Sequence, residues 1–211
     1  MKKHILISTA LIGIVTLGYS SNLKGSDYIS TQPGTTYIYQ RVEANDNDNF
    51  SIRTKIKNCN DERTQCNYVS RIKDHVKDQI DGSESKYAYD IKNGAVYIKY
   101  PNLDKETLLL PANIEFNKVR KENSSNANGK YTNSYEFTKQ IPEITVNNNK
   151  YKNCIELEAK SNIKLENQTI NTQSQEVYCK GVGLVKEIFK ETHGSEKPTV
   201  YKSLLSSVKK P

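Results

Sequence analysis

Tryptophan is absent from this 211-residue chain, and methionine occurs only at position 1. Hydrophobic residues make up 35% of the sequence, which is below the usual share in globular proteins, and alanine, the strongest helix former, is scarce. Tyrosine supplies most of the aromatic content, with 14 Tyr against 4 Phe. Because tyrosine and the β-branched residues favour strands, this composition predicts a sheet-rich structure with much exposed surface.

Catalytic motifs are missing as well. The patterns C-x-x-C, H-E-x-x-H and G-x-S-x-G do not occur, so no redox, zinc-protease or nucleophile-elbow site is predicted. His75 and His193 are expected on the surface, and His4 lies in the N-terminal apolar segment. We therefore predict a protein that is not an enzyme, with no catalytic residue, no metal and no cofactor. A Ser–His–Asp site assembled in space around His75 or His193 is the alternative that the sequence leaves open.

Paired carboxylates are the other candidates for chemistry, because glycosidases use two of them. Glu156 and Glu158 are two apart in an expected strand and so share one face of it. Leu157, between them, points to the opposite face. We predict that the two carboxylates face solvent.

The one long apolar run lies at the N-terminus. Lys2 and Lys3 precede the 13 mainly apolar residues of 5–17, and small residues at Gly18 and Ser20 suit cleavage after Ser20. This layout predicts a signal peptide over residues 1–20; an uncleaved anchor is the alternative, although about 20 apolar residues are needed to span a membrane. With no cysteine at the cleavage point we predict no lipid anchor, and with no second apolar run, no integral span in the mature chain. The expected location is a bacterial periplasm or, alternatively, the extracellular space.

Positive charge is in modest excess. The net charge is +7 for the whole chain and +5 once Lys2 and Lys3 are removed. The basic residues are spread out, without an arginine cluster or a stripe of interleaved aromatics, so nucleic acid is not an expected partner. The excess fits an ordinary solvated surface, or weak contact with anionic surfaces such as lipid headgroups or acidic polysaccharide.

Four cysteines, an even number in an exported chain, indicate two disulfides. Cys59 and Cys66 flank a turn-rich stretch between two alternating segments, and Cys154 and Cys179 come opposite each other when 152–165 and 170–185 fold about the turn at 166–169. Directly opposed antiparallel residues lie within disulfide distance. We predict the pairs Cys59–Cys66 and Cys154–Cys179; free buried thiols are the alternative.

Turn signals recur about every ten residues along the rest of the chain, which is typical of antiparallel structure. Asn93-Gly94 between alternating runs is the strongest hairpin signal. Residues 68–81 fit one face of a helix or of a strand, and 121–130 are expected to form a flexible loop. We predict a flexible segment at 21–36 and a single domain at 37–208. Its expected fold class is all-β: a curved antiparallel sheet, either a half-barrel or an open sandwich, with at most one or two short helices.

Residues 135–191 carry a recognisable order of segments. Tyr135 and Phe137 are followed by Ile-Thr-Val and a turn, then by Tyr-Lys-Asn-Cys, and finally by Gly-Val-Gly-Leu-Val-Lys at 181–186. This 57-residue stretch resembles a loose family of uncharacterised bacterial exported proteins and lipoproteins, although Asn147–Asn149 replaces the family's small-residue turn. The resemblance implies a half-barrel-like sheet similar to periplasmic lipoprotein carriers. Independently, glycines two apart predict a strand that bends or meets another backbone at Gly181 and Gly183.

A curved sheet has a concave face on which a lipid, an acyl chain or a protein segment can bind. The candidate lining residues come from the two strands around Asn93-Gly94, and a role as plain core is their alternative: they are Tyr87, Tyr89, Ile91, Val96, Ile98 and Tyr100. The expected function is non-enzymatic binding of a hydrophobic ligand or an envelope protein. A secreted or surface interaction protein and an extracytoplasmic hydrolase are the alternatives.

Overall fold

The computed structural model describes residues 22–44, 49–74, 80–101, 105–126 and 129–211. The predicted signal peptide at 1–20, His4 and His75 lie outside these residues. The elements, in chain order, are η1 Gly25–Tyr28, β1 Thr36–Glu43, β2 Asn49–Cys59, β3 Gln65–Asp74, β4 Ile80–Lys92, β5 Ala95–Lys99, β6 Thr107–Leu110, β7 Arg120–Asn126, β8 Gly129–Val146, β9 Asn149–Lys164, β10 Thr169–Cys179, β11 Gly183–His193 and β12 Thr199–Lys209. Among the residues described, no helix has the length and apolar character needed to cross a membrane.

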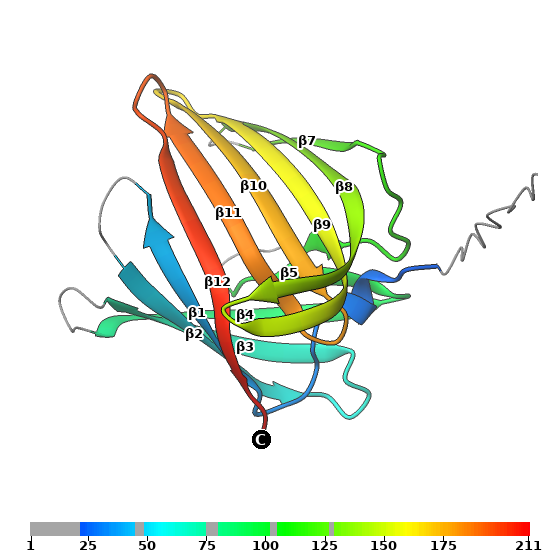
Figure 1. The fold of residues 1–211 in the computed structure, drawn as a ribbon. Coiled ribbons are helices and arrows are strands. Elements are labelled where there is room, and N and C mark those ends of the chain that lie inside the picture. Colours follow the sequence, from blue (N-terminus) through cyan, green and yellow to red (C-terminus); the bar gives the residue numbers. More distant parts are fainter. Residues whose placement is uncertain (1–21, 45–48, 75–79, 102–104, 127–128) are drawn as a thin grey trace, which may run out of the picture.

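All twelve strands form one antiparallel sheet in the order β6-β5-β4-β3-β2-β1-β12-β11-β10-β9-β8-β7. Strands β1–β6 make one meander and β7–β12 a second, and β1 pairs with β12 to join them. Figure 1 shows the sheet strongly curved, with the two meanders meeting along β1 and β12. The predicted all-β fold, a curved antiparallel sheet, is confirmed.

Asparagine-rich turns connect several of these strands. Asn93 and Gly94 both have positive φ, 52° and 86°, between β4 and β5, and Asn147 and Asn148 do the same, at 45° and 64°, between β8 and β9. Two consecutive positive φ values define the turn whose twist matches paired strands. Asparagine and glycine tolerate that conformation better than other residues, so the abundant asparagines mark the hairpins.

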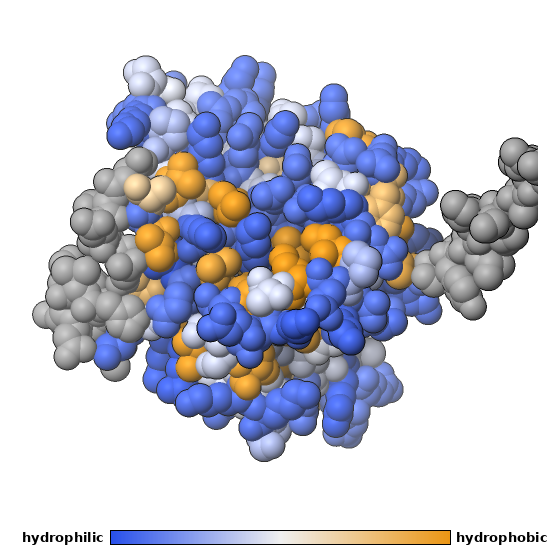
Figure 2. Space-filling model, in the orientation of Figure 1, coloured by the Kyte–Doolittle hydropathy of each residue, from blue (hydrophilic) through white to orange (hydrophobic). Residues whose placement is uncertain are grey.

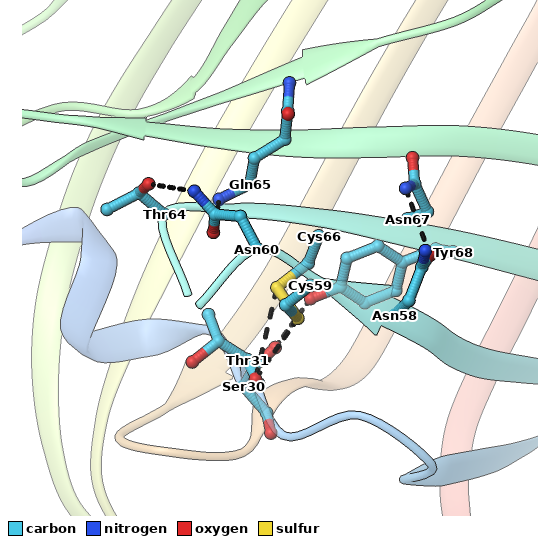
Figure 3. Close-up of a disulfide and its surroundings, with 10 residues drawn as sticks. All are labelled: Ser30, Thr31, Asn58, Cys59, Asn60, Thr64, Gln65, Cys66, Asn67 and Tyr68. Carbon is cyan, nitrogen blue, oxygen red and sulfur yellow. Dashed lines mark hydrogen bonds between the residues drawn. A yellow bond between two sulfur atoms is a disulfide. The ribbon is translucent and has the colours of Figure 1, made fainter. Parts of the chain in front are cut away.

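Both predicted disulfides are present. Cys59 lies directly opposite Cys66 across β2–β3, and Cys154 lies opposite Cys179 across β9–β10. The first disulfide closes a short turn at 60–64, where the Asn60 side chain accepts a hydrogen bond from the Gln65 backbone N–H at 2.9 Å and donates to Thr64 Oγ1 (Figure 3). Each disulfide therefore holds two strands at one end of a hairpin.

The β8–β9 hairpin bends sharply where Pro142 lies opposite Asn153. Proline cannot donate a ladder hydrogen bond, and Asn153 has a φ of 53°, outside the strand range. Beyond this point the hairpin tip, residues 143–152, folds across the sheet, and the Asn147 side chain donates a 3.1 Å hydrogen bond to the Leu205 carbonyl of β12. In Figure 1 the yellow-green end of this hairpin reaches β12.

Two core clusters lie between the halves of the sheet. The first brings Ile56 and Tyr68 of the first meander together with Val177 and Val185 of the second. The second joins Val96 and Leu110 with Phe137, Ile155 and Leu157. The inner faces of the two meanders thus pack on each other, while Figure 2 shows hydrophilic residues over most of the face in view, with apolar residues in separate patches.

The N-terminal segment corrects one expectation. Residues 22–35, predicted to be flexible, form an N-terminal strap that packs on both meanders, with Tyr28 only 1% and Ile29 only 6% exposed. Backbone N–H groups of Gly25 and Ser26 donate to the carbonyls of Pro111 and Gly94 in the first meander. Gly181 of the second meander donates to the Asp27 carbonyl at 2.7 Å.

Two local expectations are also corrected, and one open choice is settled. Residues 121–126 and 129–130, expected in a loop, belong to the paired strands β7 and β8, and β7 is an edge strand in which residues 121–123 and 125 are exposed. Gly181 lies in the turn between β10 and β11 and Gly183 begins β11, with φ of 68° and 106°, so the expected single strand over 170–185 is two strands. Residues 65–74 and 80–92 are strands, which settles the helix-or-strand choice for the described part of 68–81.

Candidate functional site

A cavity of about 330 Å³ lies between the inner faces of the two meanders. Seven tyrosines from the two meanders line it, and Tyr100 among them directly follows β5. They are Tyr37, Tyr39, Tyr68, Tyr87, Tyr89, Tyr100 and Tyr178. Ile29 and Ser30 of the N-terminal strap complete one wall. The cavity is therefore built by residues distant in sequence that only the complete curved sheet brings together.

Tyrosines of β3 and β4 form the aromatic centre of the lining. Tyr68 is paired with Tyr87 across the two strands, and their rings stack with centroids 5.3 Å apart and planes inclined by 6°. Tyr89, two residues after Tyr87 and so on the same face, lies 4.6 Å from the Tyr68 ring. The Tyr68 hydroxyl donates a 2.6 Å hydrogen bond to the Ser30 carbonyl (Figure 3). These contacts present ring surface to the cavity while the polar end of Tyr68 is satisfied by the strap.

The opposite part of the lining is charged. Arg41 of β1 donates through Nη2 to Glu187 Oε2 and through Nε to Ser203 Oγ, both at 2.7 Å. Ser203 also donates to Glu187 at 3.0 Å. The Arg41 guanidinium lies 5.6 Å from the centre of the Tyr201 ring. These two hydrogen bonds, to different residues, fix the half-buried guanidinium and make one end of the cavity polar.

A second carboxyl lies beside this polar end. Glu176 of β10 is paired with Glu187 of β11, and it accepts hydrogen bonds from the hydroxyls of Tyr178 and Ser174 at 2.6 and 2.7 Å. Burial, and to a smaller extent the charge of Glu187, raises the pKa of Glu176 above its usual range. Burial likewise raises the pKa values of Tyr39, Tyr89 and Tyr178 well above the usual range. Among the described residues that line the cavity, Arg41 and Glu187 are the charged pair, and the wall around them favours neutral groups.

The six sequence-predicted lining residues divide into two groups. Tyr87, Tyr89, Ile98 and Tyr100 line the cavity. Val96 is fully buried in the second core cluster, and Ile91 packs against that cluster. The division follows from the β4–β5 hairpin, because positions nearest its Asn93-Gly94 turn are covered by the second meander whereas those farther along border the cavity.

Sequence reasoning missed the remaining tyrosines and the charged end. Tyr37 and Tyr39 repeat the Tyr-x-Tyr pattern of Tyr87 and Tyr89, so this repeat was the available signal. Arg41 continues the same alternation in β1. Its pairing with Glu187 depends on the contact between the first and last strands, which no local pattern indicates.

The residues considered for catalysis lie elsewhere. His193 contacts the Glu191 carboxylate near the end of β11, and neither is among the described residues that line the cavity. Glu156, expected to face solvent, is only 5% exposed. Thr138 and Lys139 of the adjacent strand cover it, with a 2.9 Å hydrogen bond and a 3.0 Å ion pair.

Comparison with known proteins identifies the fold. No family model and no curated protein sequence matches the chain. The crystal structure of a "putative lipoprotein" from Parabacteroides distasonis superposes with a TM-score of 0.62 at 15% identity, covering 86% of this chain and 98% of that one. A "putative exported protein with YmcC-like fold" from Bacteroides fragilis superposes with a TM-score of 0.54 at 12% identity, covering 87% and 99%. At these identities the likeness concerns the fold.

Proposed function

We propose that this chain is a non-enzymatic exported protein that binds a hydrophobic or amphipathic ligand in the tyrosine-lined cavity. The observation that carries the proposal is the convergence of seven tyrosines from both meanders on one cavity. Its volume, about 330 Å³, lies at the lower end of the range for small-molecule sites, roughly 300–1,000 Å³. The tyrosine rings can contact the apolar part of a ligand, and the Arg41–Glu187 end of the cavity can contact its polar group.

Export is supported by two kinds of observation. Disulfides form and persist in oxidising compartments outside the cytoplasm, and the chain contains two of them. The structural neighbours are described as a lipoprotein and an exported protein of bacteria, which agrees with the predicted signal peptide. We place the protein in the periplasm; recovery from the culture supernatant instead would favour the secreted interaction protein.

The ligand proposal is tested by titrating purified protein with N-phenyl-1-naphthylamine, a neutral apolar dye whose fluorescence rises on binding, and displacing it with fatty acids. Tyr100→Ala removes a ring that lines the cavity and is already 39% exposed, so the fold should tolerate it. We expect this variant to weaken dye binding at least threefold.

Tyr97→Ala is the matched control, because Tyr97 lies on neighbouring β5 and does not border the cavity. Its dye affinity should stay within a factor of two of the unchanged protein. The proposal fails if binding is not saturable, or if the two variants lose affinity equally.

A further inference from the structure

The outer side of β2 and β3 carries a second, chemically different hollow. About 380 Å³ in volume, it lies over strands β1–β3 and includes Ile38, Ser51, Val69 and Ile72 in its lining. Its other lining residues are all cationic and all exposed: Arg53, Lys55, Lys57, Arg71 and Lys73. Thr54 and Ile56, which alternate with these residues along β2, are buried on the inner side. The hollow is therefore separate from the tyrosine-lined cavity.

Strand register brings like charges together in this hollow. Arg53 is paired with Arg71 across β2–β3, and Lys73 is paired with Ser51 in the same ladder. Like charges directly opposite each other destabilise a sheet. A bound anion between the two guanidinium groups would replace this repulsion with attraction.

Glu84 is the acidic residue that pairs with this cluster among the described ion pairs. Among the described residues that line it, none is acidic. Glu84 of β4 approaches from the side and pairs with Arg71 at 2.6 Å and with Lys86 at 3.6 Å. Glu84 is thus shared between two cations, and Arg53, Lys55 and Lys57 form no ion pair within the part of the chain that the structure describes, so the hollow keeps a positive excess without counting Lys73.

We propose that this outer hollow binds a phosphate group, carried either by a lipid headgroup or by a soluble phosphorylated molecule. Arg71 already donates through Nε and Nη2 to Glu84 Oε2, so Arg53 supplies the planar donors that suit the oxygens of phosphate. The neighbouring lysines add charge for a multiply charged anion. Ile38, Val69 and Ile72 supply an apolar wall for the part of the ligand next to the phosphate.

Inorganic pyrophosphate is the first probe, titrated calorimetrically at about 20 mM salt, where screening of exposed charges is weak. We expect the double variant Arg53→Gln/Lys55→Gln to bind it at least fivefold more weakly. Lys121→Gln/Lys130→Gln removes the same charge from exposed positions on β7 and β8 and should stay within twofold. Because Arg53→Gln relieves the repulsion with Arg71, the melting temperature of the first variant should not fall.

Sedimentation with vesicles separates the two sources of phosphate. Binding to phosphatidylglycerol vesicles but not to phosphatidylcholine vesicles, lost in the Arg53/Lys55 variant, supports a lipid headgroup. Binding of pyrophosphate without vesicle sedimentation supports a soluble ligand. Equal losses in the two double variants, or no binding of either probe, would overturn the proposal.

Discussion

At the scale of single residues, Glu176 is the most informative group near the cavity. Its carboxyl accepts two hydroxyl hydrogen bonds, which favour the charged form, yet its pKa is raised because burial and Glu187 oppose that form. A folded-state pKa above the unfolded value of about 4.3 stabilises the fold at low pH. That contribution is lost as the pH rises through the folded pKa.

Replacing Glu176 with glutamine removes this titration. We expect Glu176→Gln to be more stable relative to the unchanged protein as the pH rises from about 4 towards 8. The difference should grow by at most about 1.4 kcal/mol per pH unit. Urea unfolding at several pH values measures it, with Glu166→Gln, at an exposed position, as the control. A stability difference that is the same at every pH would contradict this reading.

Some residues of the cavity could be predicted from the sequence and others could not. Tyr87, Tyr89, Ile98 and Tyr100 could be found because a hairpin signal fixes which side chains share a face. Arg41 and Glu187 could not, because 146 positions separate them and their contact exists only once β11 and β12 pair and β12 pairs with β1.

At the scale of elements, the N-terminal strap is held by close backbone approach. An added Cβ at Gly25 would lie 2.6 Å from both the Leu110 Cβ and the Pro111 carbonyl oxygen. At Gly181 nothing lies within 4 Å of an added Cβ, and the obstacle is its φ of +68°. The two glycines are required for different reasons, steric at the strap and conformational at the β10–β11 turn.

This contrast gives a ranked prediction. Gly25→Ala should destabilise by about 3 kcal/mol, the upper range for overpacking, because backbone as well as side chain must move. Gly181→Ala should cost about 1 kcal/mol, the penalty for a left-handed alanine, and Gly181→Asn less. Urea denaturation of the three variants provides the free energies. If Gly25→Ala proved no more costly than Gly181→Ala, the strap would not be packed as described.

Strands and hairpins could be predicted from sequence where the turns contain asparagine and glycine, and where apolar and polar residues alternate along a strand. The hairpins at 93–94 and 147–148, and the two cysteine pairs, follow from local pattern alone. Strand β7 lacks such a pattern because an edge strand of polar residues needs no apolar face. The strap was mistaken for a loose segment because its burial depends on surfaces contributed by both meanders.

At the scale of the whole molecule, tyrosine shares the buried core with isoleucine, valine and leucine. Tyr28, Tyr37, Tyr68 and Tyr178 are all buried, with Tyr178 the most exposed at 6%. Tyrosine differs from leucine in that it can ionise. The buried tyrosines therefore contribute to stability only while their hydroxyls remain neutral.

Alkaline pH should consequently unfold the protein cooperatively. Burial holds the pKa values of Tyr39, Tyr89 and Tyr178 well above the usual range. Their contribution to stability is complete below the unfolded pKa of about 10 and is lost as the pH rises above it. Three such groups should lower the free energy of unfolding by roughly 4 kcal/mol per pH unit in that window. Absorbance at 295 nm and circular dichroism, followed together, should show delayed tyrosine ionisation coinciding with loss of the sheet, and prompt return to pH 8 should restore both. Complete ionisation with an intact sheet spectrum would show that these rings are open to solvent.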